Sequence, residues 1–94
     1  MKAWIVTSNR DFWIEIESTG NEQPLKALAA AGWLPESHIS KPGKMSRTLL
    51  VRTVQAFRSD GYKAGIRKAK LALQRAGFMN IEQLDRKEML DRYC

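Results

Sequence analysis

The 94 residues of this chain carry a net charge of +6, and 44% of them are hydrophobic, which suffices for one small domain with a modest core. The single cysteine, Cys94, excludes an intramolecular disulfide. No apolar run approaches the ~18 residues of a membrane span, and the first residues lack the apolar stretch of a signal peptide. We therefore expect a cytoplasmic protein that forms one domain over residues 1–94 and has no membrane partner.

A β-hairpin is predicted at the start of the chain. Residues 3–7 and 12–17 are short runs rich in Trp, Ile and Val, and residues 8–11 between them favour a turn. Because side chains alternate along a strand, a hairpin that closes at Thr7 and Phe12 places one set of residues on a common core face. These residues are Ala3, Ile5, Thr7, Phe12, Ile14 and Ile16.

Trp4 and Trp13 fall on the opposite face of this hairpin, beside Glu15 and Glu17. The two rings either form an exposed platform that anchors a partner, or belong to the core beneath a covering helix. The carboxylates would repel phosphate, so a protein contact or a core role is favoured over base stacking. The same carboxylates are not expected to be catalytic, because strand alternation alone places them on one face.

A first helix is predicted over residues 22–31. Asn21 is a suitable N-cap, and Pro24 falls in the first turn, where its missing N–H costs little. The sequence Ala-Gly-aromatic that ends the segment, with Gly32 and Trp33, is typical of a glycine C-cap followed by a ring that packs back on the last turn.

Residues 34–46 are predicted to be a basic connector, because Pro35, Pro42 and Gly43 interrupt regular structure. Residues 48–57 that follow are ambiguous. Their β-branched residues favour a strand, whereas the spacing of their larger apolar residues also suits a helix. We assign this segment to a strand, since a strand before the next helix gives a simpler fold.

The second helix is predicted over residues 60–76, with Ser59 as a cap, and it is strongly amphipathic. Its apolar side carries Tyr62, Ile66, Ala69, Leu73 and Ala76. Its other side carries Lys63, Arg67, Lys68, Lys70 and Arg75. Ala-Gly-Phe at residues 76–78 repeats the stop signal of the first helix, so the chain is expected to hold two strand–helix units.

The tail is predicted to be extended at residues 79–81 and then helical, with Asp85 and Glu88 spaced as a capping pair. Residues 62–93 contain, in order, a basic helix, a Gly-aromatic stop, an extended Asn-Ile-x-x-Leu and a short helix. This order resembles the helix–extended–helix motif of SAP-type, LEM-type and Rho N-terminal modules. Several such modules bind nucleic acid, so the resemblance implies that function for this part of the chain.

These elements predict a single α+β domain. The N-terminal hairpin and a third strand would form a small sheet with two main helices on one face, and a short C-terminal helix would close the end. Split βαβ topologies are the nearest named class.

Positive charge is concentrated in one segment of the chain. Residues 41–75 carry a net charge of +9, against −2 for residues 1–40 and −1 for residues 76–94. A local basic excess implies a polyanionic or acidic partner. The candidate contact residues are Lys41, Lys44, Arg47, Arg52, Arg58, Lys63, Arg67, Lys68, Lys70 and Arg75.

Lys63, Arg67 and Lys70 are spaced i, i+4, i+7, so they project from one side of the helix and could contact successive phosphates. A solvated face is the default for an amphipathic helix, but this face has no acids to pair with its cations. His38 stands alone and Cys94 has no positioned base nearby in the sequence, so we expect neither a metal site nor a nucleophile.

We predict a small non-enzymatic protein, without a cofactor, that binds DNA or RNA through the basic helix and loop. The alternative is a protein-binding inhibitor or adaptor, of the kind that phages encode, which docks on an acidic protein surface or a nucleoprotein complex. Both hypotheses are compatible with a homo-oligomer.

Overall fold

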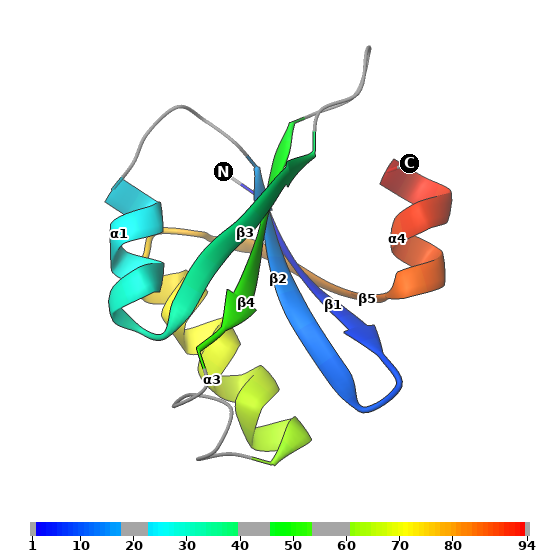
Figure 1. The fold of residues 1–94 in the computed structure, drawn as a ribbon, viewed down its shortest axis with the longest axis horizontal. Coiled ribbons are helices and arrows are strands. Elements are labelled where there is room, and N and C mark those ends of the chain that lie inside the picture. Colours follow the sequence, from blue (N-terminus) through cyan, green and yellow to red (C-terminus); the bar gives the residue numbers. More distant parts are fainter. Residues whose placement is uncertain (1, 18–22, 40–45, 54–60, 94) are drawn as a thin grey trace.

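The computed structural model of the protein describes residues 2–17, 23–39, 46–53 and 61–93. These residues form a five-stranded sheet and three helices (Figure 1), which confirms the predicted α+β fold. In chain order the elements are β1 (Lys2–Ser8), β2 (Asp11–Glu17), α1 (Gln23–Ala30), β3 (Trp33–Ile39), β4 (Arg47–Arg52), α3 (Tyr62–Arg75), β5 (Asn80–Asp85) and α4 (Arg86–Tyr93).

The sheet has the strand order β3-β4-β2-β1-β5, and neighbours are antiparallel except for the parallel pair of β1 and β5. The N-terminal hairpin has the predicted register, since Thr7 lies opposite Phe12. Asn9 and Arg10 form its turn with φ angles of 45° and 64°. Two positive φ angles in a row give the turn twist that matches the twist of the flanking strands.

The sheet has five strands where the sequence predicts three. The predicted connector at residues 34–46 is wrong in its first part, because β3 runs through Pro35 to Ile39. An edge strand tolerates this proline, whose missing N–H can face solvent, and the pairing with β4 shifts register between Pro35 and Ser37. The strand predicted from residue 48 is confirmed by β4 as far as Arg52.

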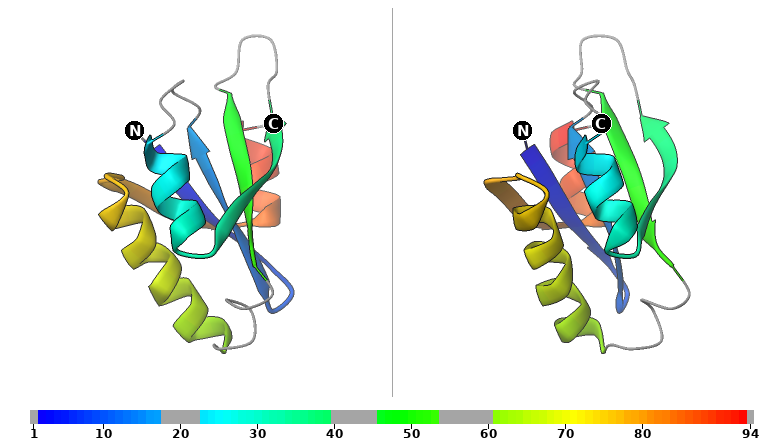
Figure 2. Two further views of the ribbon diagram at one scale, coloured as in Figure 1. Left: turned by 60° about the vertical axis from the view of Figure 1, so that its left-hand side comes forward. Right: turned by 90° about the vertical axis from the view of Figure 1, so that its left-hand side faces the viewer.

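Helices α1 and α3 lie on the same face of the sheet (Figure 2) and cover the main core. Both Ala-Gly-aromatic stops are confirmed: Gly32 and Gly77 have φ angles of 96° and 100°, and Trp33 and Phe78 are buried. Each stop ends a unit made of a hairpin and a helix. The buried core residues under these helices include Ile5, Phe12, Ile14, Leu28, Leu50, Ala69, Leu73 and Phe78.

Helix α4 packs on the opposite face of the sheet, rather than closing its end beside the other helices. It covers the half of that face formed by β1 and β5, where a second cluster of buried residues contains Trp4, Val6, Leu84 and Met89. The sheet therefore has helices on both faces, but the face beneath α4 is only partly covered by helix.

The predicted capping pair of the last helix is confirmed. The backbone N–H of Glu88 donates to Oδ1 of Asp85 at 2.8 Å, and the N–H of Asp85 donates to Oε1 of Glu88 at 3.4 Å. The other predicted caps, Asn21 and Ser59, lie outside the described residues, as do residues 54–57. Among the described residues, a helix with the length and hydropathy that a bilayer crossing requires is absent.

Candidate nucleic-acid interface

Small and apolar residues along one side of α3 hold this helix against the sheet. Gly65, Ala69 and Leu73 are buried, and a Cβ atom at Gly65 would lie 3.0 Å from Cε1 of Phe12. The helix backbone therefore sits directly on the Phe12 ring, and the opposite side of α3 points away from the sheet.

The outward side of α3, here called the basic face, carries positive charge alone. Its five cations are all exposed, and the helix contains no acid. They are Lys63, Arg67, Lys68, Lys70 and Arg75. Four of them, all except Lys68, form no ion pair with any residue that the structure describes. The neighbouring helix α1 adds an exposed Lys26 and no acid, so the described residues of these two helices bring like charges together, and an external anion would reduce their repulsion.

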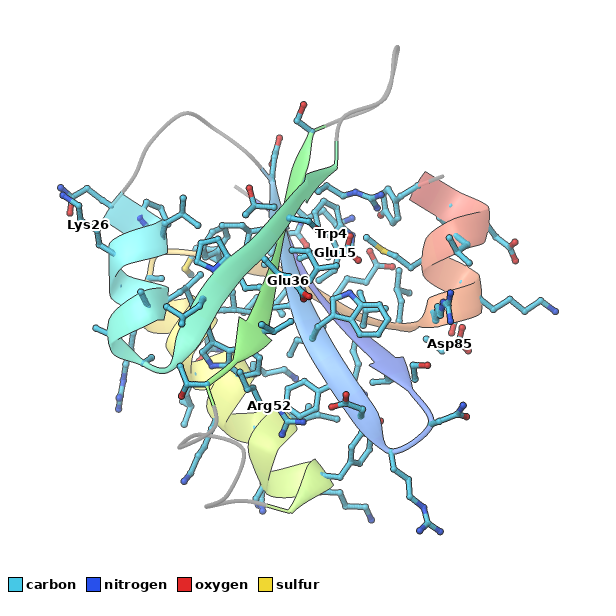
Figure 3. All side chains as sticks on the ribbon, viewed as in Figure 1. Trp4, Glu15, Lys26, Glu36, Arg52 and Asp85 are labelled. Atoms are coloured by element: carbon cyan, nitrogen blue, oxygen red, sulfur yellow. The ribbon has the colours of Figure 1, made fainter. Side chains whose placement is uncertain are left out.

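A group of ion pairs around Glu82 lies on the far side of the sheet. Lys2 Nζ lies 3.0 Å from Oε2 of Glu82, and Arg92 Nη1 lies 2.6 Å from Oε1 of the same carboxylate. The hydrogen bond from Lys2 holds the pKa of Glu82 below its ordinary value. Figure 3 shows Lys26 on α1 and Asp85 at the end of β5, just before α4; these two helices lie on opposite sides of the sheet. The sheet thus separates the cations of α3 from the carboxylate of Glu82.

Arg47 is buried, so the prediction that it contacts a partner is wrong. Its side chain is 2% exposed, and its Nε lies 3.8 Å from Oε1 of Glu15. Its guanidinium carbon lies 5.7 Å from the ring centroid of Tyr93 on α4. Burial raises the pKa of the Glu15 carboxyl, and the charge of Arg47 acts in the opposite direction. Strand alternation places Arg47 on the face that α4 covers.

Arg52 is also unavailable to a phosphate, contrary to prediction. Its side chain is 8% exposed, and Nη2 lies 2.6 Å from Oδ1 of Asp11. Its guanidinium carbon lies 4.2 Å from the centroid of the Phe12 ring. The remaining predicted contact residues, Lys41, Lys44 and Arg58, lie outside the described residues.

The two tryptophans of the hairpin have different environments. Trp4 is 0% exposed and makes an edge contact with Tyr93, with the ring centroids 5.0 Å apart, so it belongs to the core and cannot anchor a partner. Trp13 is half-buried and lines an open cleft of about 350 Å³. The cleft lies near the end of the pairing between β2 and β4, whose last pair is Ile14 with Leu50. Its other lining residues are Asp11, Phe12, Glu36, Leu49, Val51 and Arg52.

A second hollow, here called the hairpin-tip hollow, has a volume of about 240 Å³ and lies beside the first turn of α3. It is lined by Thr7, Ser8, Asn9, Tyr62, Asp85, Arg86 and Lys87. The sequence places Tyr62 on the apolar side of its helix, yet the residue is 37% exposed. The sequence does not reveal this hollow, because three distant segments build it. The one feature of the sequence that points to the hollow is Tyr62, an aromatic residue in the first turn of a basic helix.

Within the described part of the chain, no three His, Cys, Asp or Glu side chains gather closely enough to hold a metal ion. Comparison with protein-family models, with curated proteins and with solved structures finds no match for this chain.

Proposed function

We propose that the protein binds nucleic acid, without catalysis, through the basic face of α3. The observation that carries the proposal is the absence of acids on this helix, together with the absence of ion pairs at four of its five exposed cations within the described residues. A polyanion that pairs with these cations releases its condensed counterions, which makes binding favourable at low salt.

The spacing of the cations suits a row of phosphates. With a helical rise of about 1.5 Å per residue, Arg67 lies about 6 Å along the axis from Lys63 and about 4.5 Å from Lys70. The exposed amide of Gln74 is the one Asn or Gln side chain on α3. Contacts with phosphates therefore dominate over readout of base edges, and selectivity for sequence is weak.

The proposal is tested by titrating labelled single-stranded DNA, duplex DNA and RNA with the protein over a range of salt concentrations. The double variant Arg67→Glu/Lys70→Glu is expected to lose affinity for all sequences alike. Its slope of log affinity against log salt for duplex DNA should fall by about two, because two phosphate contacts are removed.

The matched control keeps the charges and exchanges the side chains. Arg67→Lys/Lys70→Arg should retain both the affinity and the salt slope, since phosphate contacts of this kind depend on charge. Equal binding by the wild type and the charge-reversed variant, or no binding by the wild type near physiological salt, would refute the proposal.

The second candidate function is that of an inhibitor or adaptor that docks on a protein. The observation in its favour is the open cleft at Trp13, whose walls include Leu49 and Val51. If the wild type binds no nucleic acid, capture of an acidic protein or nucleoprotein partner is the next measurement. Trp13→Ala should then weaken capture at least tenfold while the fold, checked by circular dichroism, is retained. Unchanged capture would exclude the cleft as the docking site.

A further inference from the structure

We infer that the hairpin-tip hollow binds one unpaired base of a single-stranded nucleic acid whose phosphates follow the basic face of α3. This inference rests on the proposed function and deepens it, since it names the form of nucleic acid and the place of one base.

The position of the hollow connects it to the basic face. Tyr62 is the first residue of α3, and Lys63 follows it as the first cation of that face. Arg86 and Lys87 line the hollow from the start of α4. A strand that runs along α3 therefore meets further cations where the helix begins, and its backbone stays in a positive field at the hollow.

The size of the hollow suits a single flat ring. Its volume of about 240 Å³ is below the range of about 300–1,000 Å³ for pockets that hold drug-sized ligands. Bases of a duplex are stacked and paired inside the helix, so such a hollow takes a base only from a single strand or from a base that has left the stack.

Tyr62 supplies the surface on which a base stacks. It is 37% exposed, and its ring makes an edge contact with the buried Phe12, with centroids 6.1 Å apart and planes at 77°. The ring is therefore held in place before a ligand arrives, which lowers the entropy cost of stacking. Stacking on an aromatic ring tolerates every base, in agreement with the weak sequence selectivity proposed for α3.

Polar groups around the ring can meet a base edge. Ser8 and Asn9 line the hollow from the hairpin turn, and together they offer a hydroxyl and an amide that donate and accept hydrogen bonds. Asp85 also lines the hollow, but its Oδ1 accepts the N–H of Glu88 and caps α4. The net charge of the lining residues remains positive because Arg86 and Lys87 outnumber this acid.

The larger cleft at Trp13 is a poor place for the base, although it also offers an aromatic ring. Asp11 and Glu36 line that cleft, and its one cation, Arg52, already pairs with Asp11. The carboxylates would repel the phosphates on either side of a base bound there. The hairpin-tip hollow is therefore the site favoured by charge.

The test compares Tyr62→Ala and Tyr62→Phe with the wild type. Dissociation constants are measured for single-stranded oligothymidine and for a duplex of the same length, at one salt concentration and across a salt series. Tyr62→Ala is expected to weaken single-strand binding about tenfold, to leave duplex binding nearly unchanged and to leave the salt slope unaltered. Tyr62→Phe should bind like the wild type, because stacking requires the ring and not the hydroxyl.

Met79→Ala is the matched control, because Met79 is a 90% exposed apolar residue that lies outside both the hollow and α3. It should leave both affinities unchanged. An independent measurement uses the wild-type protein and oligothymidine with a photoreactive base, and maps crosslinks by mass spectrometry. Crosslinks to Tyr62 or Asn9 support the inference, and crosslinks confined to the cleft at Trp13 overturn it.

The failures of the two proposals are distinguishable. If Tyr62→Ala binds single strands as well as the wild type, while reversal of Arg67 and Lys70 still abolishes binding, the base site is wrong and the basic face stands. The same conclusion follows if Tyr62→Ala weakens single-strand and duplex binding equally. If the wild type binds no nucleic acid near physiological salt, both proposals fail together.

Discussion

Glu15 and Arg47 form an ion pair that is almost entirely removed from solvent, with side chains 4% and 2% exposed. Trp13 Nε1 donates a further hydrogen bond to Oε2 of Glu15 at 3.3 Å. Taking both charges out of water is costly, and their attraction offsets this cost only while both are present. The pair therefore makes the fold depend on two side chains that a reading of charge alone assigns to the surface.

Loss of one member of the pair is expected to be far more damaging than loss of both. Arg47→Ala should lower the free energy of unfolding by about 3–5 kcal/mol at neutral pH, because it leaves the Glu15 carboxylate buried alone. Burial already raises the pKa of Glu15, so this carboxyl takes up a proton more readily than an exposed one. The stability deficit of Arg47→Ala should therefore shrink as the pH falls and grow as the pH rises.

Urea unfolding at neutral and acidic pH tests this prediction. It is measured for Arg47→Ala and for the double variant Glu15→Gln/Arg47→Met. The double variant should be close to the wild type in stability, since it removes both buried charges and keeps their volume. If Arg47→Ala lowers the free energy of unfolding by less than about 1 kcal/mol, the pair behaves like an exposed ion pair.

Polar contacts help to attach α4 to the sheet. Tyr93 Oη accepts a hydrogen bond from Lys2 Nζ at 2.9 Å and donates one to Oε2 of Glu82 at 3.2 Å. Arg92 reaches the other oxygen of the same carboxylate at 2.6 Å. One acid on β5 thus joins the last turn of α4 to the first residue of β1.

Acid should loosen this attachment. The hydrogen bond from Lys2 lowers the pKa of Glu82 from its ordinary 4.5, so its carboxylate stabilises the fold above that value and this contribution is lost as the pH falls through the folded-state pKa. Hydrogen exchange of α4 amides, corrected for the intrinsic rate, should accelerate as the pH is lowered from neutral through the folded-state pKa of Glu82.

Glu82→Gln is expected to show faster exchange in α4 already at neutral pH and little further change in acid. Asp91→Asn, which alters an exposed acid on the same helix, should behave like the wild type. An acid response of α4 that persists undiminished in Glu82→Gln would assign the effect to another group.

How well each element could be predicted depends on whether its own residues determine it. The alternation of core-facing and outward-facing residues along the strands predicts the register of the hairpin, because a shift of one residue would move Ile5 and Ile14 out of the core. The 3.6-residue period of a helix likewise predicts that Ala69 and Leu73 of α3 lie on a different side of the helix from its cations. The strand β3 could not be recognised, because Pro35 is compatible with a strand only at an edge, and edge position is decided by other strands.

At the scale of the whole molecule, the sequence predicts the class of fold and the location of charge along the chain, but not the order of the strands. Which cations reach solvent follows from that order. The run of bases includes both the exposed Arg67 and the buried Arg47, and nothing local distinguishes them before the pairing of β4 with β2 brings Arg47 close to Glu15. The candidate interface was therefore predictable on α3, where one helix contains it. The hairpin-tip hollow was not predictable, because it joins three segments.

The parallel pairing of β1 with β5 has a consequence for how the chain acquires its structure. Lys2 pairs with Asn80, so β1 finds its second neighbour only when residues far along the sequence are available. Contacts this distant in sequence raise the contact order and slow folding. During synthesis the β1-β2 hairpin emerges from the ribosome early, with Trp4 and Val6 still uncovered, because the residues that bury them lie in β5 and α4. Until β5 and α4 emerge, this apolar surface of the nascent chain is open to chaperones.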